Sequence, residues 1–146
     1  MKFLKLSLIL FSLSACNTTS TSNQVELPFL QTSHGDCHRI NTNIANYKHN
    51  GKCIVSKITV SVSFGKNLNV QNLDGLKCEA VGAATQGIFV PPAVLRVPQP
   101  MSSSEPLTVA CSIGEYQGSA TQYPKKVNPE AIGYLFIDDR MHIVVK

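Results

Sequence analysis

The chain has 146 residues, of which 43% are hydrophobic, and a formal net charge of +4. This length suits one domain with a modest core. Lys125 and Lys126 are the one pair of adjacent Lys or Arg residues, and no basic stripe is interleaved with aromatic residues. Because nucleic-acid binding needs a clustered basic face, the composition argues against that class of protein.

The N-terminal segment has the features of an export signal. Lys2 and Lys5 form a short positive region, and the residues from Leu6 to Leu13 are apolar apart from two serines. About 7–15 apolar residues are typical of a signal peptide, whereas a membrane-spanning helix needs about 18 or more. Removal of the signal leaves eleven basic residues against nine acidic ones, so the mature net charge is about +2.

The signal ends in Leu13-Ser14-Ala15-Cys16, which closely resembles the lipobox of bacterial lipoproteins. The resemblance implies cleavage before Cys16, acylation of that cysteine with chains such as palmitate, and attachment to a lipid bilayer. Asn17, rather than aspartate, follows the cysteine, which implies the outer membrane. Two or more acyl chains anchor a protein stably, whereas one does not. An ordinary secretory cleavage after Ala15 is the alternative.

The stretch NTTSTSNQ after Cys16 consists of small polar residues without periodicity, which is typical of a flexible tether. We therefore expect three segments. Residues 1–15 form the lipoprotein signal peptide, residues 16–30 the lipidated cysteine and its tether, and residues 31–146 the folded domain.

Four cysteines remain once Cys16 is set aside: Cys37, Cys53, Cys78 and Cys111. An even number in an exported chain predicts two disulfides, for which three connectivities are possible. Pairing along the sequence, Cys37 with Cys53 and Cys78 with Cys111, is the most natural of the three.

Period-two alternation predicts an all-β domain. In the segment 53–64, Ile58, Val60, Val62 and Phe64 fall on one face while the residues between them are polar. Similar short runs follow, separated by turn signals, at 76–82, 87–90, 93–97, 107–112, 134–137 and 141–145. This spacing predicts a single β-sandwich, braced by the two disulfides. The residues IDDR at 137–140 predict a tight hairpin between the last two strands.

The run from Cys78 to Ala120 resembles the PEGA-like, carboxypeptidase-regulatory-like β-sandwich lipoproteins of Gram-negative bacteria. Their pattern is a cysteine, a proline leading into an alternating strand, and L-x-V-x-C followed by glycine and tyrosine. The matching residues here are Cys78, Pro92, Leu107, Val109, Cys111, Gly114 and Tyr116. The resemblance covers about forty residues. It implies an immunoglobulin- or transthyretin-like sandwich with a Cys78–Cys111 bridge, and it carries no enzymatic activity.

A cluster of histidines and cysteines has the spacing H-x₂-C-H-x₁₀-H-x₃-C, and its histidines are His34, His38 and His49. Imidazoles and thiolates are good zinc or copper ligands. The spacing matches no standard zinc module, and His34 stands where a haem-attachment motif needs a cysteine. We expect the cysteines to be bridged and no cofactor to be bound, with a metal-binding lipoprotein as the alternative.

The remaining candidate is the proline-rich segment IFVPPAVLRVPQP at 88–100. It could serve as an extended docking segment, or as an edge strand whose prolines prevent aggregation. Neither a G-x-S-x-G nor an H-E-x-x-H motif is present, so we do not expect an enzyme. The sequence favours a non-catalytic envelope lipoprotein that binds, scaffolds or docks, either in an envelope protein complex or at the cell surface. An inhibitor of envelope enzymes is a weaker alternative.

Overall fold

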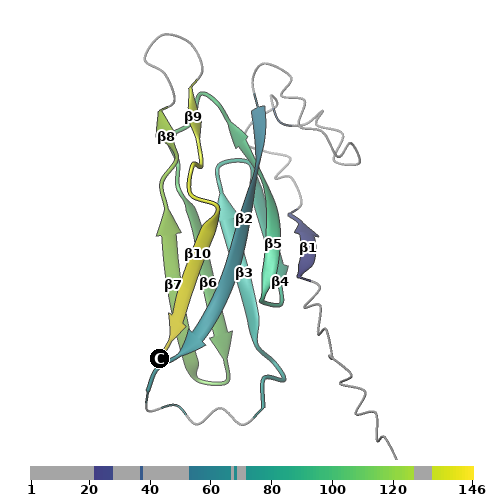
Figure 1. Ribbon diagram of the computed structural model, residues 1–146, viewed down its shortest axis with the longest axis vertical. Helices are drawn as coiled ribbons and strands as arrows, with labels where there is room; N and C mark the ends of the chain where they lie inside the picture. The colour runs from purple at the N-terminus through teal and green to yellow at the C-terminus, as the bar shows by residue number, and fades with distance from the viewer. Residues whose placement is uncertain (1–21, 28–36, 38–52, 67, 69–71, 127–132) are drawn as a thin grey trace, which may run out of the picture.

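The structure, a computed structural model, describes residues 22–27, 37, 53–66, 68, 72–126 and 133–146. Within these ranges, ten strands form two four-stranded sheets and one two-stranded ribbon (Figure 1). The all-β fold and the two disulfides predicted from the sequence are confirmed. In the described part of the chain, no helix is long and apolar enough to cross a membrane.

The first sheet, called sheet A here, combines strands from both ends of the chain. Its central pair, β2 and β5, is antiparallel, whereas its outer strands run parallel to their neighbours. In spatial order the strands are β1 (Asn23–Glu26), β5 (Ala93–Pro100), β2 (Cys53–Phe64) and β10 (Arg140–Val145).

The second sheet, sheet B, is antiparallel throughout. Tight two-residue loops join β3 to β4 and β6 to β7. In spatial order the strands are β4 (Thr85–Phe89), β3 (Lys77–Gly82), β6 (Leu107–Ile113) and β7 (Tyr116–Gln122). The separate ribbon pairs β8 (Lys125–Lys126) with β9 (Tyr134–Leu135).

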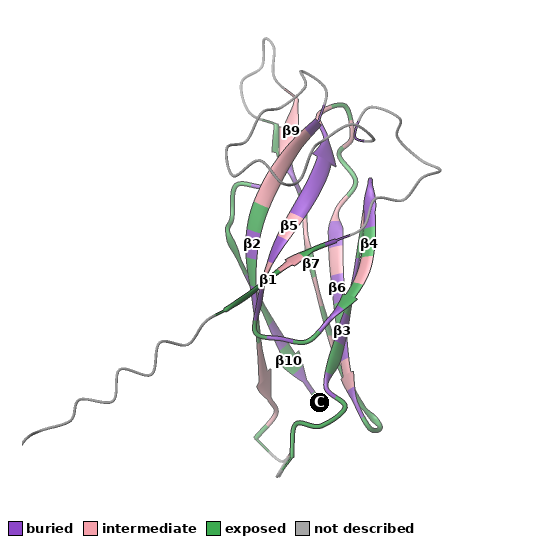
Figure 2. Cartoon of the chain, turned by 90° about the vertical axis from the view of Figure 1, so that its right-hand side faces the viewer, coloured by how far each residue is buried: buried purple, intermediate pink, exposed green. Residues whose placement is uncertain are grey.

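The core lies between the two sheets, which form two layers when the molecule is seen from the side (Figure 2). Alternation places one face of each strand in this core, as the sequence predicts: Ile58 and Val60 of β2 are fully buried, whereas Thr59 and Ser61 are exposed. Burial of each large aliphatic side chain contributes about 1.5–3 kcal/mol. The largest contributors are Ile58, Val60, Leu95, Val97, Ile143 and Val145 from sheet A, and Phe89, Leu107, Val109 and Ile113 from sheet B.

On one side of the sandwich the two sheets are joined at the seam between β7 and β10. The N–H of Gln117 donates to the carbonyl oxygen of Lys146 at 3.1 Å, and the N–H of Lys146 donates back at 3.0 Å. The backbones approach so closely that a Cβ atom on Gly118 would lie 2.2 Å from the carbonyl oxygen of Val144. Only glycine fits there without a shift of the backbone.

The opposite side of the sandwich lies between β1 and β4, and Figure 2 looks onto it. Val25 of β1 packs against the core, and Leu27, directly after β1, is 2% exposed and belongs to the core cluster. Glu26 forms an ion pair with Arg96 of β5. Residues 23–26, which the sequence analysis assigns to the tether, are therefore a strand of sheet A.

Two further sequence-based interpretations are corrected by the structure. The last strand does not form a hairpin with β9: residues 136–139 connect the ribbon to sheet A, where β10 pairs in parallel with β2. The segment 88–100 is not one edge strand, because residues 93–100 form β5, between β1 and β2. Pro98 and Pro100 lack an N–H and cannot donate a hydrogen bond to a neighbouring strand. They are tolerated in β5 because the described pairing of β5 with β1 ends at Arg96, before both prolines.

Candidate functional site

The disulfides pair Cys37 with Cys53 and Cys78 with Cys111. Cys78 and Cys111 face each other on β3 and β6, so this bridge cross-links neighbouring strands of sheet B within the core. Cys37 and Cys53 pack with Ala84, in the loop between β3 and β4, as a separate small cluster. The Cys37–Cys53 bridge therefore attaches residue 37 to the end of the sandwich where β2 begins.

Two of the sequence predictions lie outside the described residues: the alternative metal ligands His34, His38 and His49, and Cys16 as the site of lipidation. The cysteines of the same cluster are bonded to each other, so neither offers a thiolate to a metal in this state. Among the described residues, no group of three or more His, Cys, Asp or Glu side chains is arranged to hold a metal ion.

The fourth histidine makes a contact that the sequence did not reveal. His142 of β10 lies between two serines of β2: Ser61 Oγ is 2.9 Å from Nδ1, and Ser63 Oγ is 2.8 Å from Nε2. The parallel register places His142 opposite Ser61, which brings the ring within reach of both hydroxyls. Ser63 and Lys66 also have S-x-x-K spacing, but Lys66 lies in the turn after β2 rather than one helical turn from the serine.

A serine beside a base is the beginning of a nucleophilic site, but among the described residues the hydrogen bonds of the His142 ring go to two hydroxyls and not to a carboxylate. A third group, usually a carboxylate, must orient the base, and here both ring nitrogens are occupied by hydroxyls. The contacts lie on the solvent-facing side of sheet A. We interpret the cluster as a cross-strand hydrogen-bond network that stabilises the β2–β10 pairing.

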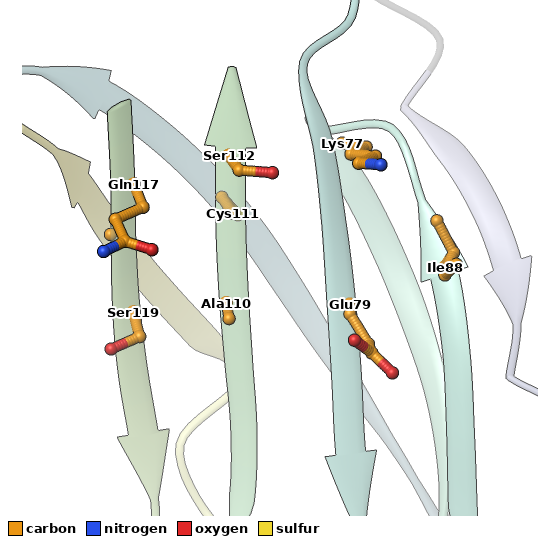
Figure 3. Close-up of a pocket in the computed structure, with 9 residues that line it drawn as sticks. Lys77, Glu79, Ile88, Ala110, Cys111, Ser112, Gln117 and Ser119 are labelled. Carbon is orange, nitrogen blue, oxygen red and sulfur yellow. The ribbon is translucent and has the colours of Figure 1, made fainter. Parts of the chain in front are cut away.

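The outer face of sheet B carries an open hollow of about 600 Å³ (Figure 3). Small side chains at outward positions, Ala110 and Ser112 of β6 and Ser119 of β7, form its floor. The larger side chains of Lys77, Glu79, Ile88 and Gln117 surround this floor, and the lining is completed by Cys111 and Gly118. The hollow exists because small residues of β6 and β7 lie beside long side chains on β3, β4 and β7.

The lining is chemically mixed and carries no net charge. Lys77 contributes an ammonium group and Glu79 a carboxylate, whereas the serine hydroxyls and the Gln117 amide both donate and accept hydrogen bonds. Ile88 adds an apolar surface and is 69% exposed. None of the nine described lining residues is a histidine.

Three exposed apolar side chains lie beside the hollow, near the β4 edge of sheet B. Val81 of β3, Ile88 of β4 and Val90, just after β4, are 43%, 69% and 62% exposed. A cluster of exposed apolar side chains on a small domain is typical of an interaction surface. The hollow and these three side chains together form what we call the outer patch of sheet B. It includes Ile88 from the segment that the sequence analysis singled out, but its floor was not foreseen.

Sequence reasoning missed the floor because its residues carry no chemical signal. Alanine and serine at alternating strand positions are ordinary solvent-facing residues, and Ser119 lies on β7, a strand that alternation did not predict. The two-residue loop Gly114–Glu115, with Gly114 at a φ of 57°, was the available signal. A glycine in such a loop indicates a hairpin, and therefore a second strand after β6.

Comparisons of the chain with protein-family models, with curated proteins and with solved structures gave no match.

Proposed function

We propose that the chain is a non-catalytic lipoprotein of the bacterial outer membrane that docks an envelope partner. Cys16 is the lipid anchor in this proposal, and the outer patch of sheet B is the contact surface. The observation that carries it is the hollow, whose lining is mixed polar and apolar with no net charge, beside the exposed apolar side chains of Val81, Ile88 and Val90. Lipidation rests on the lipobox-like Leu13–Cys16, and export is supported by the two disulfides, which form in oxidising compartments.

The geometry of the hollow favours docking over catalysis and over enclosure of a small ligand. Its volume is in the range of ligand pockets, but it opens along the face of a sheet instead of surrounding a ligand. A partner would place a surface segment over it, with its polar groups bonded to Ser112, Ser119 and Gln117. The Cys78–Cys111 bridge lies directly beneath and holds β3 and β6 in register, so the face is rigid before binding.

The anchor is tested by mass spectrometry of the mature chain isolated from membranes. We expect an N-terminal Cys16 carrying acyl chains, and partition of the chain into the detergent phase. The Cys16→Ala variant should lose the acyl mass and leave the membrane fraction. A mature chain that begins at Cys16 without any acyl group would show ordinary secretory cleavage and refute the anchor.

Docking is tested by site-specific photocross-linking of the full chain in intact cells. A benzophenone amino acid at Ala110, an exposed position on the floor of the hollow, should give one dominant adduct with an envelope protein. The matched control is Thr59, an exposed strand position on the outer face of sheet A. Adducts from both positions in similar yield, or from neither, would contradict docking through sheet B.

A further inference from the structure

Among the described residues, strand β4 is an edge of sheet B without the usual protection. Its five residues, TQGIF, contain no charge and no proline, although natural edges are normally guarded by one of these or by a bulge. The other described edges differ. Strand β1 has four residues and carries the ion-paired Glu26, and β7 is bonded to Lys146 through Gln117.

The register shows which backbone groups β4 turns toward this edge. Gly82 and Thr85 flank a two-residue loop and face each other, so they form a hydrogen-bonded pair. Bonded and non-bonded pairs then alternate along the hairpin, and Gly87 and Phe89 also bond to β3. The N–H and C=O groups of Gln86 and Ile88 therefore point away from β3, and β4 pairs with no other described strand.

We propose that β4 binds an extended segment of the partner as an added antiparallel strand of sheet B. This inference rests on the proposed docking function and specifies the class of ligand. Two residues of the edge offer a donor and an acceptor each, and an extended peptide pairs with such groups at every second residue. An antiparallel direction continues the pattern of all the other pairings in sheet B.

The side chains next to the edge define the chemistry of that segment. Ile88 and Val90 favour apolar residues beside them, because β-branched and aromatic neighbours stabilise each other across strands. Gln86 donates through Nε2 to Glu79 Oε1 at 2.6 Å, so the partner residue beside Gln86 lies near a carboxylate. A lysine or arginine there is long enough to reach it across β4. The added strand should read, from its N-terminus, apolar-x-apolar-x-basic.

A second copy of this chain fits the edge less well than such a segment. Symmetric antiparallel pairing centred on Ile88 would place Gln86 of each copy beside Val90 of the other. The carboxylate-bonded amide of Gln86 would then face an apolar side chain twice, and Glu79 would gain no cationic partner. An asymmetric segment satisfies Ile88 and Gln86 together.

The test uses the full chain in detergent micelles and the synthetic peptide acetyl-Thr-Val-Thr-Val-Thr-Lys-Thr-amide. Amide exchange is measured by NMR with and without peptide. The amides of Gly87 and Phe89 should be protected throughout, whereas those of Gln86 and Ile88 should become protected when the peptide is added. A peptide with glutamate in place of lysine should bind more weakly.

The matched variants are Ile88→Pro and Ile88→Val. The proline removes the outward N–H but leaves the β3–β4 ladder intact, so binding should weaken about tenfold or more, whereas valine should bind as the native chain does. Thermal unfolding of both variants checks that they are folded. If the proline variant alone is unfolded, the peptide is changed instead. An N-methyl group on the peptide residue that faces Ile88 removes the backbone hydrogen bond from the peptide N–H to the Ile88 carbonyl oxygen, so binding should weaken in the same way.

Three results would overturn the inference: no saturable binding, binding without protection of Gln86 and Ile88, or a peptide-free dimer in which these amides are already protected. The outcome is independent of the docking experiment. An adduct at Ala110 without peptide binding would refute strand addition and leave docking in place. Peptide binding without an adduct in cells would refute the proposed function.

Discussion

Replacement of Gly118 by alanine tests whether the two sheets are joined along β7 and β10. A Cβ atom at this position would lie 2.2 Å from the carbonyl oxygen of Val144 and 2.8 Å from its carbonyl carbon. Both are backbone atoms of β10, so no side-chain rotation relieves the overlap. One strand must move away from the other, which also stretches the two hydrogen bonds between Gln117 and Lys146.

The expected cost follows from these two effects. Forcing an extra carbon into a packed region costs about 1–3 kcal/mol, and each backbone hydrogen bond that is weakened adds up to about 1 kcal/mol. We expect Gly118→Ala to lower the free energy of unfolding by about 2–4 kcal/mol. For a domain of this size, that corresponds to a melting temperature lower by about 10 °C.

Gly65→Ala is the matched control, because Gly65 also faces the end of β10. Its Cβ atom would lie 3.6 Å from the carbonyl oxygen of Val145, an ordinary contact. Equilibrium unfolding in guanidinium chloride, with the disulfides intact, should leave this variant within about 0.5 kcal/mol of the native chain. If Gly118→Ala proves equally mild, β7 and β10 are not in contact and the seam is refuted.

The remaining predictions address the core, the ribbon and the serine–histidine cluster. Leu27→Ala should lower the free energy of unfolding by about 2–4 kcal/mol, measured in denaturant. Leu73→Ala, at a position 56% exposed, should change that free energy little. Equal effects of the two variants would show that Leu27 is not in the core. Gly133→Ala should lower the melting temperature, because Gly133 has a φ of 89° and a Cβ atom there would meet a backbone carbonyl at 2.1 Å; an unchanged melting curve would contradict this packing. A fluorophosphonate probe should not label Ser63, and labelling that disappears in His142→Ala would mean that the cluster is catalytic.

The alternation of apolar and polar residues was sufficient to predict the strands that bury one face against the other sheet. β2, β3, β5, β6 and β10 all alternate between buried and less buried residues over part or all of their length. This pattern depends only on the two-residue repeat of a strand and on the presence of one core. The same reasoning fails where a strand contributes little to the core. In β7, only Ala120 packs against the core cluster, and the strand is otherwise polar.

Pairing partners could not be predicted in the same way. The hairpin expected at 137–140 rested on two turn-forming aspartates, but that signal does not distinguish a hairpin from a longer connection. β7 ends at the end of the sandwich where β2 begins, and the chain reverses there through the antiparallel ribbon of β8 and β9, so β10 runs parallel to β2 (Figure 1). The His142 contacts with Ser61 and Ser63 follow from that parallel register, so they were equally beyond prediction.

The position of β1 connects the proposed anchor with the proposed docking edge. Asn23 is the seventh residue after Cys16, and seven extended residues span at most about 25 Å. An acylated Cys16 would therefore keep β1 within that distance of the bilayer, instead of the longer range that a tether to residue 30 would allow. Because β1 and β4 border the same side of the sandwich, the β4 edge lies on the side that such an anchor would restrain. A partner segment presented close to the membrane would meet β4 at a high effective concentration. Binding would then need only a modest intrinsic affinity, as expected of an added strand that is held by two residues of the edge.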